Sequence, residues 1–353
     1  MQGKMKQAIV ADVKKLAIRE VDIPQIAPHE VLVKVEYVGI CGSDLHGYER
    51  AGTPRGRATF PFVLGHESGG TVIEVGADVA DLKPGDRVAM EPGKTCGQCE
   101  FCREGKYNLC PDVRFFASGK TDGTFQEYVA HEAALCFKLP DNMSTLEGAL
   151  IEPLAVGFHA AMQGGAQVGQ RAMVFGVGCI GLVSLLALKA MGVTEIYAVD
   201  LLENRAQKAK ELGATQVING SKEDVIAKAK EYFGDRPWCD IIIDTSGEDI
   251  AIAQSLELLK KGGTLVMVGY NTNHMLNLNT TTLINKEITV KTVFRYRHIY
   301  PMAIKAVAEG GLPIADVVTD YFELDDIQRA LDESLENKAA IVKGVIKVAK
   351  DLD

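Results

Sequence analysis

Two different rhythms of apolar and polar residues divide the chain. Up to about residue 155, runs such as EVLVKVEYVGI, GGTVIEVG and DRVAME alternate apolar with polar positions and are rich in β-branched residues. This pattern predicts β-strands, and the intervening KPGD is typical of a turn. We therefore expect a β-rich region over residues 1–155.

From about residue 171 the rhythm changes to strands that alternate with helices. Six expected strands are RAMVFGVG, EIYAVD, VING, CDIIIDTSG, TLVMVGY and EITVKTVF. The expected helices are CIGLVSLLALKAMG, LENRAQKAKELGA, KEDVIAKAKEYFG and DIAIAQSLELLKKGG. Such alternation predicts βαβ units and a parallel sheet, and therefore an α/β fold. The tail from about residue 294 is mixed.

Length and composition agree with two globular domains. The 353 residues, 47% of them hydrophobic, exceed the roughly 100–200 residues of one domain. A net charge of −9 argues against nucleic acid or an anionic membrane as partner. No apolar run approaches the roughly 20 residues that span a bilayer. The start, MQGKMKQAIVADVKK, lacks the apolar core of a signal peptide, so we expect a cytoplasmic protein.

The segment GVGCIG, Gly176 to Gly181, matches the G-x-G-x-x-G pattern. It follows a predicted strand and opens a predicted helix, which is the context that dinucleotide binding needs. Gly176 permits the tight turn, Gly178 lets a pyrophosphate approach the backbone, and Gly181 allows close helix–strand packing. The positive end of the helix faces the phosphates.

An acidic residue follows at the expected distance. Asp200 ends the next strand about 20 residues past Gly181, where a carboxylate hydrogen-bonds the ribose 2′-hydroxyl and repels a 2′-phosphate. This favours NAD over NADP. The alternative is that Asp200 only caps the following helix. Arg205 is a candidate for contact with the adenine, or else a solvated helix residue.

Four of the eight cysteines are crowded into one short segment with the spacing C-x2-C-x2-C-x7-C. In a long chain of a reducing compartment, clustered cysteines more often bind metal than form disulfides. Four thiolates suit a closed tetrahedral zinc site. Four free thiols or an iron–sulfur cluster are the alternatives. We expect a structural zinc lobe over about residues 91–112, held by Cys96, Cys99, Cys102 and Cys110.

Three other stretches carry metal-ligand residue types. GICGSDLHG contains Cys41, LGHESGG contains His66 and Glu67, and GALIEPLAVGFHA contains Glu152. A lone cysteine is usually packed in a core, whereas a carboxylate in an apolar stretch takes up a proton or needs a partner. None of the three stretches is convincing alone.

Together these motifs resemble the zinc-dependent medium-chain dehydrogenases and, among them, the polyol (sorbitol, L-iditol, xylitol) dehydrogenase branch. The resemblance covers nearly the whole chain. It implies a GroES-like β-rich catalytic domain over residues 1–155 and 294–353, and a Rossmann domain with a doubly wound parallel sheet over residues 156–293. The motifs that carry it are GICGSDLH, GHESGGTVIEVG, KPGDRVAMEPG, the four-cysteine lobe, LPDNMSTLEGALIEPLAVG, GVGCIG and VFRYRHIYPMAI.

The resemblance implies a catalytic zinc in addition to the structural one. Cys41 and His66 would be inner ligands, Glu152 would bind directly or through a water, and Glu67 would be a ligand that exchanges with water. Zinc, thiolate, neutral imidazole and the Glu152 carboxylate sum to zero charge, which suits a dry site. Asp44 would accept a hydrogen bond from the His66 ring.

Other roles also come with the resemblance. Ser43 and His46 match a proton relay, although His46 is alternatively a surface loop residue. Arg295 and Tyr296 would lie near the nicotinamide and the polyol hydroxyls, and Phe116 is a pocket aromatic or a core residue. The implied cofactor contacts are Gly176, Gly178, Ile180, Gly181, Asp200, Arg205, Val268, Phe294 and Arg295. The implied substrate contacts are Ser43, Phe116, Glu152, Arg295 and Tyr296.

The expected reaction is oxidation of a sugar alcohol to a ketose, with hydride transfer to NAD. A secondary-alcohol, butanediol or threonine dehydrogenase shares the motifs, whereas a structural NAD-binding protein has no need of the ligand set. Many sorbitol dehydrogenases have an aromatic residue directly after the CGSDxH histidine. Here Gly47 stands there, followed by Tyr48, so the pocket is wider or Tyr48 fills it. Family precedent implies a homotetramer.

Overall fold

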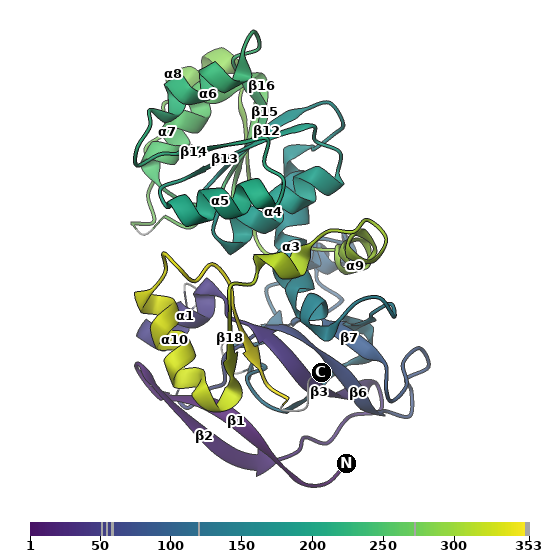
Figure 1. Ribbon diagram of the computed structural model, residues 1–353. Coiled ribbons are helices and arrows are strands. Elements are labelled where there is room, and N and C mark those ends of the chain that lie inside the picture. The colour runs from purple at the N-terminus through teal and green to yellow at the C-terminus, as the bar shows by residue number, and fades with distance from the viewer. Residues whose placement is uncertain (51, 54–55, 58–59, 119–120, 272, 350–353) are drawn as a thin grey trace. The chain divides into compact units, whose positions relative to one another are not determined.

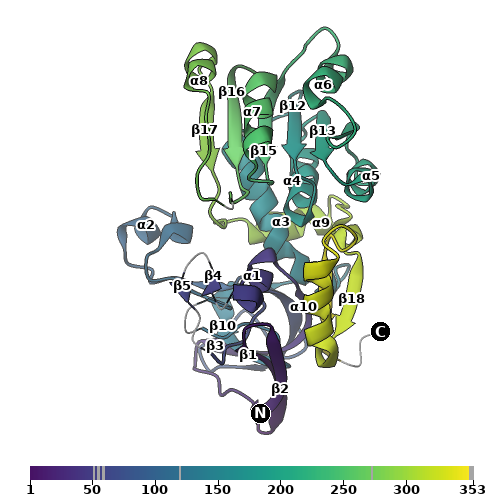
Figure 2. The ribbon, with the colours of Figure 1, turned by 90° about the vertical axis from the view of Figure 1, so that its left-hand side faces the viewer.

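The computed structural model describes residues 1–349 except residues 51, 54–55, 58–59, 119–120 and 272. The chain forms two compact units (Figures 1 and 2). Unit 1 contains Met1–Glu152, Tyr300–Glu309 and the chain from Val318 onward, and unit 2 contains Pro153–Ile299 and Gly310–Val317. The boundaries that we expected after residues 155 and 293 lie a few residues from these divisions. Gly310–Val317, expected in the catalytic domain, falls in unit 2.

Unit 1 is built on a seven-stranded sheet, consistent with its alternating segments. The strand order is β11-β7-β6-β3-β19-β18, and β10 pairs with the first half of β3. The strands are β3 Glu30–Gly39, β6 Glu67–Val75, β7 Arg87–Met90, β10 Tyr128–Glu132, β11 Cys136–Lys138, β18 Asp320–Glu323 and β19 Gly344–Lys347. Smaller pairs are β1 Lys4–Asp12 with β2 Lys15–Asp22, β4 Gly52–Thr53 with β5 Gly56–Arg57, and β8 Gly93–Lys94 with β9 Arg114–Phe115.

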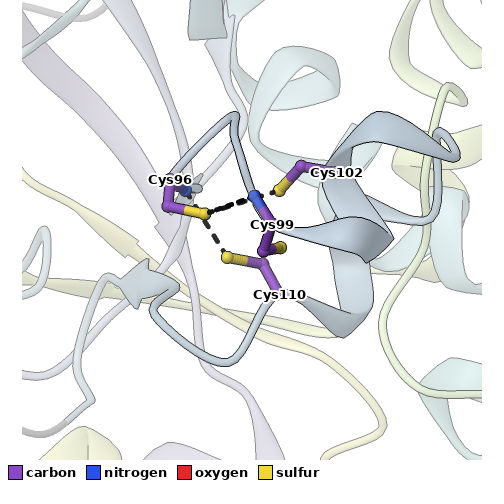
Figure 3. Close-up of side chains that lie close together, drawn as sticks. All are labelled: Cys96, Cys99, Cys102 and Cys110. Atoms are coloured by element: carbon purple, nitrogen blue, oxygen red, sulfur yellow. Dashed lines mark hydrogen bonds between the residues drawn. The ribbon is translucent and has the colours of Figure 1, made fainter.

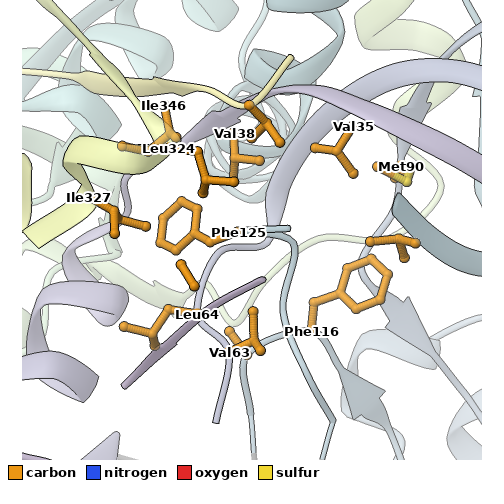
Figure 4. Close-up of a cluster of buried hydrophobic side chains, with 14 of the residues drawn as sticks. Val35, Val38, Val63, Leu64, Met90, Phe116, Phe125, Leu324, Ile327 and Ile346 are labelled. Atoms are coloured by element: carbon orange, nitrogen blue, oxygen red, sulfur yellow. The ribbon is translucent and has the colours of Figure 1, made fainter. Parts of the chain in front are cut away.

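Short helices complete unit 1 around an apolar core. They are α1 Gly42–Arg50, α2 Glu100–Arg103, α9 Tyr300–Ala308 and α10 Ile327–Glu336, with 3-10 turns at Tyr107–Leu109, Ala133–Leu135 and Leu324–Asp326. Helix α10 buries Ile327, Ala330 and Leu331, the spacing of one apolar helix face. Figure 4 shows Ile327 of this face beside Phe125 and Val38 in the core.

Unit 2 contains the parallel sheet that the βαβ pattern predicts. Its order is β14-β13-β12-β15-β16-β17, the doubly wound arrangement of dinucleotide-binding folds. The strands are β12 Arg171–Phe175, β13 Glu195–Asp200, β14 Gln216–Asn219, β15 Cys239–Asp244, β16 Leu259–Met267 and β17 Thr289–Thr292. The GroES-like and Rossmann expectation is therefore confirmed.

Helices cover both faces of this sheet (Figure 1). They are α3 Thr145–Gly164, which begins in unit 1, α4 Cys179–Ala190, α5 Glu203–Glu211, α6 Val225–Phe233, α7 Asp249–Leu258 and α8 Thr280–Lys286, followed by the 3-10 turn Ile314–Val317. Helices α4 and α5 pack over β12, β13 and β14, and α7 packs between α6 and α8. Right-handed crossovers that run in opposite directions from β12 place these two helix layers on opposite faces.

One expected element boundary is wrong. The segment DIAIAQSLELLKKGG was expected to be helical throughout, but α7 ends at Leu258 and β16 begins at Leu259. Leu259 already has an extended backbone (φ −71°, ψ 141°), so the helix ends there, and Gly262 with φ +70° lies within the strand that follows. Residues 260–263 form an irregularity in the pairing of β15 with β16.

Within the part of the chain that the structure describes, every helix is too short or too polar to traverse a lipid bilayer.

Candidate active site

Cys41, His66 and Glu67 lie together because two neighbouring strands end side by side. Strand β3 ends at Gly39, which pairs with Glu67 at the start of β6. Cys41 lies just after the last residue of β3, and His66 lies just before the first residue of β6. Because the two strands are antiparallel, both residues lie at the same end of this strand pair. The potential ligand atoms of the three residues all lie within 4.8 Å of one another. A thiolate, an imidazole and a carboxylate at this spacing suit zinc.

Asp44 fixes the orientation of the His66 ring. Its carboxylate is buried, and Oδ1 lies 3.4 Å from His66 Nδ1. The same carboxylate accepts backbone hydrogen bonds from Gly65 and Cys41, each at 3.0 Å. Burial tends to raise the pKa of Asp44, but His66 and the two backbone donors outweigh it and lower the pKa. With Nδ1 directed at Asp44, Nε2 is the nitrogen left for a metal.

Glu67 has a partner that was not anticipated from the sequence. Its carboxylate forms an ion pair with the ammonium of Lys343, and both side chains are almost completely buried. Lys343 precedes β19, which pairs with the same end of β3. No local motif marks this lysine, because its relevance arises only when the last strand closes the sheet.

Glu152 is buried on α3 but lies outside the three-residue ligand group that the described residues form. Its charge acts on a second buried carboxyl, Glu91, the glutamate of the motif KPGDRVAMEPG. Burial raises the pKa of Glu91 to about 7; the Tyr107 hydroxyl, which donates to Oε1 at 2.9 Å, opposes the shift and the charge of Glu152 adds to it. Tyr107 belongs to the cysteine lobe, so a hydrogen bond connects that lobe to the surroundings of Glu152.

The aromatic residue beside the metal ligands is Phe115 rather than Phe116. The Phe115 and His66 rings have centroids 5.5 Å apart. Phe116 lies in the core of unit 1, with its ring 4.6 Å from that of His131 (Figure 4). Of the two readings of Phe116, the geometry therefore favours the core residue. The sequence signal was the FF pair, whose two members point to opposite faces in extended chain.

Ser43 and His46 lie three residues apart on α1, a spacing that places both on one helix face. His46 is exposed and Ser43 is half-buried. Partial burial, followed by the charges of Arg50 and Lys338, lowers the pKa of His46. A neutral imidazole at the surface end of such a pair can accept a proton and pass it to water.

Tyr48 does not fill the place of the missing pocket aromatic. It is fully buried in the core of unit 1; its hydroxyl donates to Asp332 at 2.6 Å, and the backbone oxygen of Lys14 lies 3.2 Å away. Gly47 is buried beside it, and a Cβ at this position would lie 3.1 Å from Leu64 Cδ2. The space next to Gly47 is therefore already filled by aliphatic atoms.

The four lobe cysteines converge as their spacing predicts (Figure 3). Their sulfur atoms lie within 4.8 Å of one another. Backbone N–H groups donate to two of them, from Cys96 to Cys110 Sγ at 3.4 Å and from Cys99 to Cys96 Sγ at 3.3 Å. Hydrogen bonds from the backbone of Gln98 and Cys99 lower the pKa of Cys96 to about 7. Thiolate character and N–H···S bonds are what a tetrahedral zinc site needs, so this group fits the ion.

The glycine loop in unit 2 has the geometry of a pyrophosphate cradle. Gly176 has φ +77° and forms the turn after β12. A Cβ on Gly181 would collide with the Gly176 carbonyl oxygen, so α4 can approach the strand only with glycine there. Gly178 is the N-cap of α4. The Arg205 guanidinium lies 3.7 Å from the position of a Cβ on Gly178, which places it over the loop.

Asp200 ties the glycine loop to the end of β13. One carboxylate oxygen accepts from the Val177 N–H at 2.8 Å and the other from the Leu202 N–H at 3.0 Å. The N-cap of α5 is Leu202, without a side-chain hydrogen bond, so the alternative role of Asp200 as a helix cap does not describe this structure. The carboxylate is instead held beside the loop.

The remaining expected cofactor and substrate residues lie in unit 2. Ile180 is in the first turn of α4, and Val268 follows β16, with its N–H bonded to the Asp244 carbonyl. Phe294, Arg295 and Tyr296 follow β17. The Arg295 guanidinium stacks on the Phe294 ring at 4.8 Å, and Tyr296 is buried. Arg295 adopts a left-handed backbone conformation with φ +56°, which is uncommon for a non-glycine residue.

Comparison with known proteins agrees with this geometry. Residues 27–141 match the alcohol dehydrogenase GroES-like domain, and residues 179–309 match the zinc-binding dehydrogenase family. An uncharacterized zinc-type alcohol dehydrogenase-like protein, YdjJ of Escherichia coli, is 44% identical over 98% of this chain and 99% of its own length. Sorbitol dehydrogenase of Bacillus subtilis is 39% identical over 97% of each chain.

A solved structure extends the likeness to three dimensions. L-idonate 5-dehydrogenase of Escherichia coli superposes with a TM-score of 0.91 at 32% identity and covers 99% of each chain. The residues that could bind zinc, the parallel sheet with its glycine loop and the similarity over the full length all point to the same family. The chain belongs to the zinc-dependent medium-chain dehydrogenases, in the branch that includes the sorbitol dehydrogenases.

Proposed function

We propose that this protein oxidises a sugar alcohol to a ketose with NAD as hydride acceptor. The observation that carries the proposal is the group of partly buried Cys41 with buried His66 and Glu67, with Asp44 behind the imidazole. The similarity of the chain to sorbitol dehydrogenase and to L-idonate 5-dehydrogenase favours a polyhydroxylated substrate over a simple alcohol.

The residues of unit 1 would bind the metal, orient its ligands and exclude water. Cys41 and His66 would hold a zinc ion, with Glu152 acting directly or through a water and Glu67 in exchange with water. When bound, the ion acts as a Lewis acid that lowers the pKa of a substrate hydroxyl. Asp44 keeps the imidazole in one tautomer. Phe115 covers one side of the His66 ring and helps to exclude water.

The proton released from the substrate needs a path to solvent. Ser43 and His46, on one face of α1, provide a hydroxyl and an imidazole in sequence, and exposed His46 delivers the proton to water. Glu152 offers a second, carboxylate route. In unit 2, the N-terminus of α4 and the glycine loop would bind the cofactor pyrophosphate, and Asp200 would face the adenosine ribose.

The substrate assignment is tested by following NAD reduction with a panel of C4 to C6 polyols, 2,3-butanediol and threonine. We expect kcat/KM for the best polyol to exceed that for butanediol and threonine. A preference for butanediol or threonine would contradict the polyol assignment and leave the family assignment intact. Absence of NAD reduction with every compound in zinc-loaded protein would favour a non-catalytic role.

The cofactor assignment is tested at Asp200. We expect NAD to be preferred over NADP, and Asp200→Ser to improve use of NADP by roughly tenfold or more, because a carboxylate facing the 2′-phosphate is removed. Glu203→Gln is a matched control, since this neighbouring carboxylate is already paired with Lys222. Equal use of NAD and NADP by the unmodified protein would refute the role of Asp200.

We propose two zinc ions per chain, one in each cysteine-containing group. Assembly as a homotetramer and a cytoplasmic location stay predictions.

A further inference from the structure

The glycine loop after β12 is held from two sides by the neighbouring strands. On the β13 side, the Gly176 N–H donates to the Val199 carbonyl oxygen at 2.8 Å. The next N–H, of Val177, donates to Asp200 at 2.8 Å. On the β15 side, the Thr245 hydroxyl donates to the Gly176 carbonyl oxygen at 2.6 Å. The strands on either side of β12 therefore bond both polar groups of the Gly176 backbone.

Thr245 is packed tightly against this loop. A Cβ on Gly176 would lie 3.1 Å from the Thr245 hydroxyl oxygen and 3.2 Å from the Ser246 backbone nitrogen. A Cβ on Gly181, in the first turn of α4, would lie 3.2 Å from the same hydroxyl oxygen and would collide with the Gly176 carbonyl oxygen. The hydroxyl therefore lies where the turn after β12 meets the start of α4.

A buried aspartate keeps Thr245 in place. Asp244 is the last residue of β15 and is fully buried. Its carboxylate accepts from the Ser246 hydroxyl at 2.6 Å and from the Gly247 N–H at 2.9 Å. Its carbonyl oxygen accepts from the Val268 N–H at 2.8 Å. The turn that carries Thr245 is thus bonded to itself and to the chain after β16, so the hydroxyl has little freedom to leave the loop.

These contacts lie where a sheet of this kind binds its ligand. Strand β12 pairs with β13 on one side and with β15 on the other. Open α/β sheets bind ligands beyond the carboxyl ends of the strands at the point where the order of the strands reverses. The first N–H groups of a helix such as α4 have no acceptor within the helix, so their orientation decides how well the loop binds a pyrophosphate.

We propose that Thr245 is a positioning residue for the cofactor. Its hydroxyl fixes the Gly176 carbonyl and thereby keeps the first N–H groups of α4 in the orientation that binds the pyrophosphate. The inference rests on the proposed use of NAD. It assigns a role in cofactor binding to a side chain on a different strand from the glycine motif.

The test is Thr245→Val, which keeps the shape of the side chain and removes the donor. We expect the Kd of NADH, followed by NADH fluorescence, and that of ADP-ribose, followed by displacement of NADH, to rise by roughly 3- to 10-fold, the scale of one lost hydrogen bond. The Kd of adenosine, which lacks both phosphates, should stay the same. KM for NAD should rise by the same factor as the Kd of NADH, with little change in kcat at saturating NAD.

Two further variants separate the hydroxyl from general damage to the fold. Thr245→Ser keeps the donor and should bind NADH and ADP-ribose as the unmodified protein does. Thr215→Val is the matched control, because the Thr215 hydroxyl also bonds a backbone group, accepting from the Ile196 N–H at 2.9 Å at the amino end of β13. It should leave all three Kd values unchanged.

The outcomes discriminate between this proposal and the proposed function. Unchanged Kd values in folded Thr245→Val would overturn the role of Thr245 and leave the use of NAD intact. An equal rise in the Kd of adenosine, or weak binding that persists in Thr245→Ser, would also overturn it, because the hydroxyl would then not be the cause. An unmodified protein that binds neither NADH nor ADP-ribose would overturn both proposals.

Discussion

The two cysteine-containing groups of unit 1 differ in every property that decides the use of a metal. The lobe offers four identical sulfur ligands from a single short segment, partly exposed and already hydrogen-bonded by the backbone. The group at Cys41 mixes sulfur, nitrogen and oxygen from residues separated along the chain, and its His66 and Glu67 are buried. Four thiolates close the coordination sphere of zinc, whereas a mixed set can leave a position for substrate. If both groups bind zinc as proposed, the same ion would serve stability in one place and chemistry in the other.

The comparison predicts its largest effect at Cys41. If Cys41 is an inner ligand as proposed, Cys41→Ser removes it, and loss of Lewis-acid assistance worth several kcal/mol corresponds to a decrease in kcat/KM of roughly 10³-fold or more. The melting temperature should change little, and the zinc content should fall from two ions per chain to one. Cys136→Ser, a buried cysteine outside both groups, should retain both ions. Retained activity in Cys41→Ser would contradict the assignment of the Cys41 group to catalysis and of the lobe to stability.

Glu152 provides the next largest effect. If Glu152 belongs to the catalytic metal, Glu152→Gln cannot supply the negative charge or accept a proton, and kcat should fall by about 10²- to 10⁴-fold. If it is only a buried hydrogen-bonding residue, stability should drop by about 1–3 kcal/mol with little loss of turnover. Glu147→Gln on the same helix is the control. Its carboxylate accepts from Ser144 at the start of α3, so stability and not turnover should respond.

Substitution of Cys99 should lower stability and largely spare turnover, the reverse of what is expected for Cys41. Cys99→Ser opens the lobe site, and loss of a structural metal should reduce the free energy of unfolding by about 3 kcal/mol. The protein that remains folded should keep most of its kcat. Thermal unfolding, zinc content and turnover per folded molecule measure this. A fall in kcat as large as that of Cys41→Ser would mean that the lobe takes part in the chemistry.

The smallest expected effect tests the hydrogen bond that connects the cysteine lobe to Glu91 and the surroundings of Glu152. Burial raises the folded-state pKa of Glu91 above its ordinary 4.5 to about 7, so the folded state binds more protons in this window and stability falls as pH rises through it. Tyr107→Phe removes the donor to the Glu91 carboxylate and should cost about 1 kcal/mol. The loss should be larger at pH 8, where Glu91 is ionised, than at pH 5. Tyr321→Phe, at an exposed tyrosine, is the control, and a loss independent of pH would argue against ionisation of Glu91.

The features that the sequence predicts are those formed by residues close together in the chain. The lobe cysteines and the glycine loop each lie within one turn region, so spacing alone indicates how their atoms converge. The parallel sheet follows from strands with a continuous run of buried apolar residues, such as residues 172–175 in β12 and 241–243 in β15. The start of β16 differs from the expectation because LELLKK has helical spacing, whereas the backbone is already extended at Leu259.

Features that depend on distant pairing were not visible in the sequence. Lys343 is one of many lysines until β19 joins β3, and Glu91 is one of many glutamates until the Tyr107 hydroxyl reaches it. Phe115 and Phe116 are adjacent and chemically identical. Only the direction of the strand end decides which ring lies beside His66 and which beside His131.

The pairing of β19 with β3 also has a consequence for synthesis. During translation, β3 emerges early, but the strand that pairs with its second half is separated from it by the whole of unit 2. A nascent chain that ends near residue 300 therefore exposes the edge of β3 and leaves Glu67 without Lys343. Unpaired strand edges are sites of aggregation. We expect ribosome-bound or truncated forms that lack β18 and β19 to depend on chaperones.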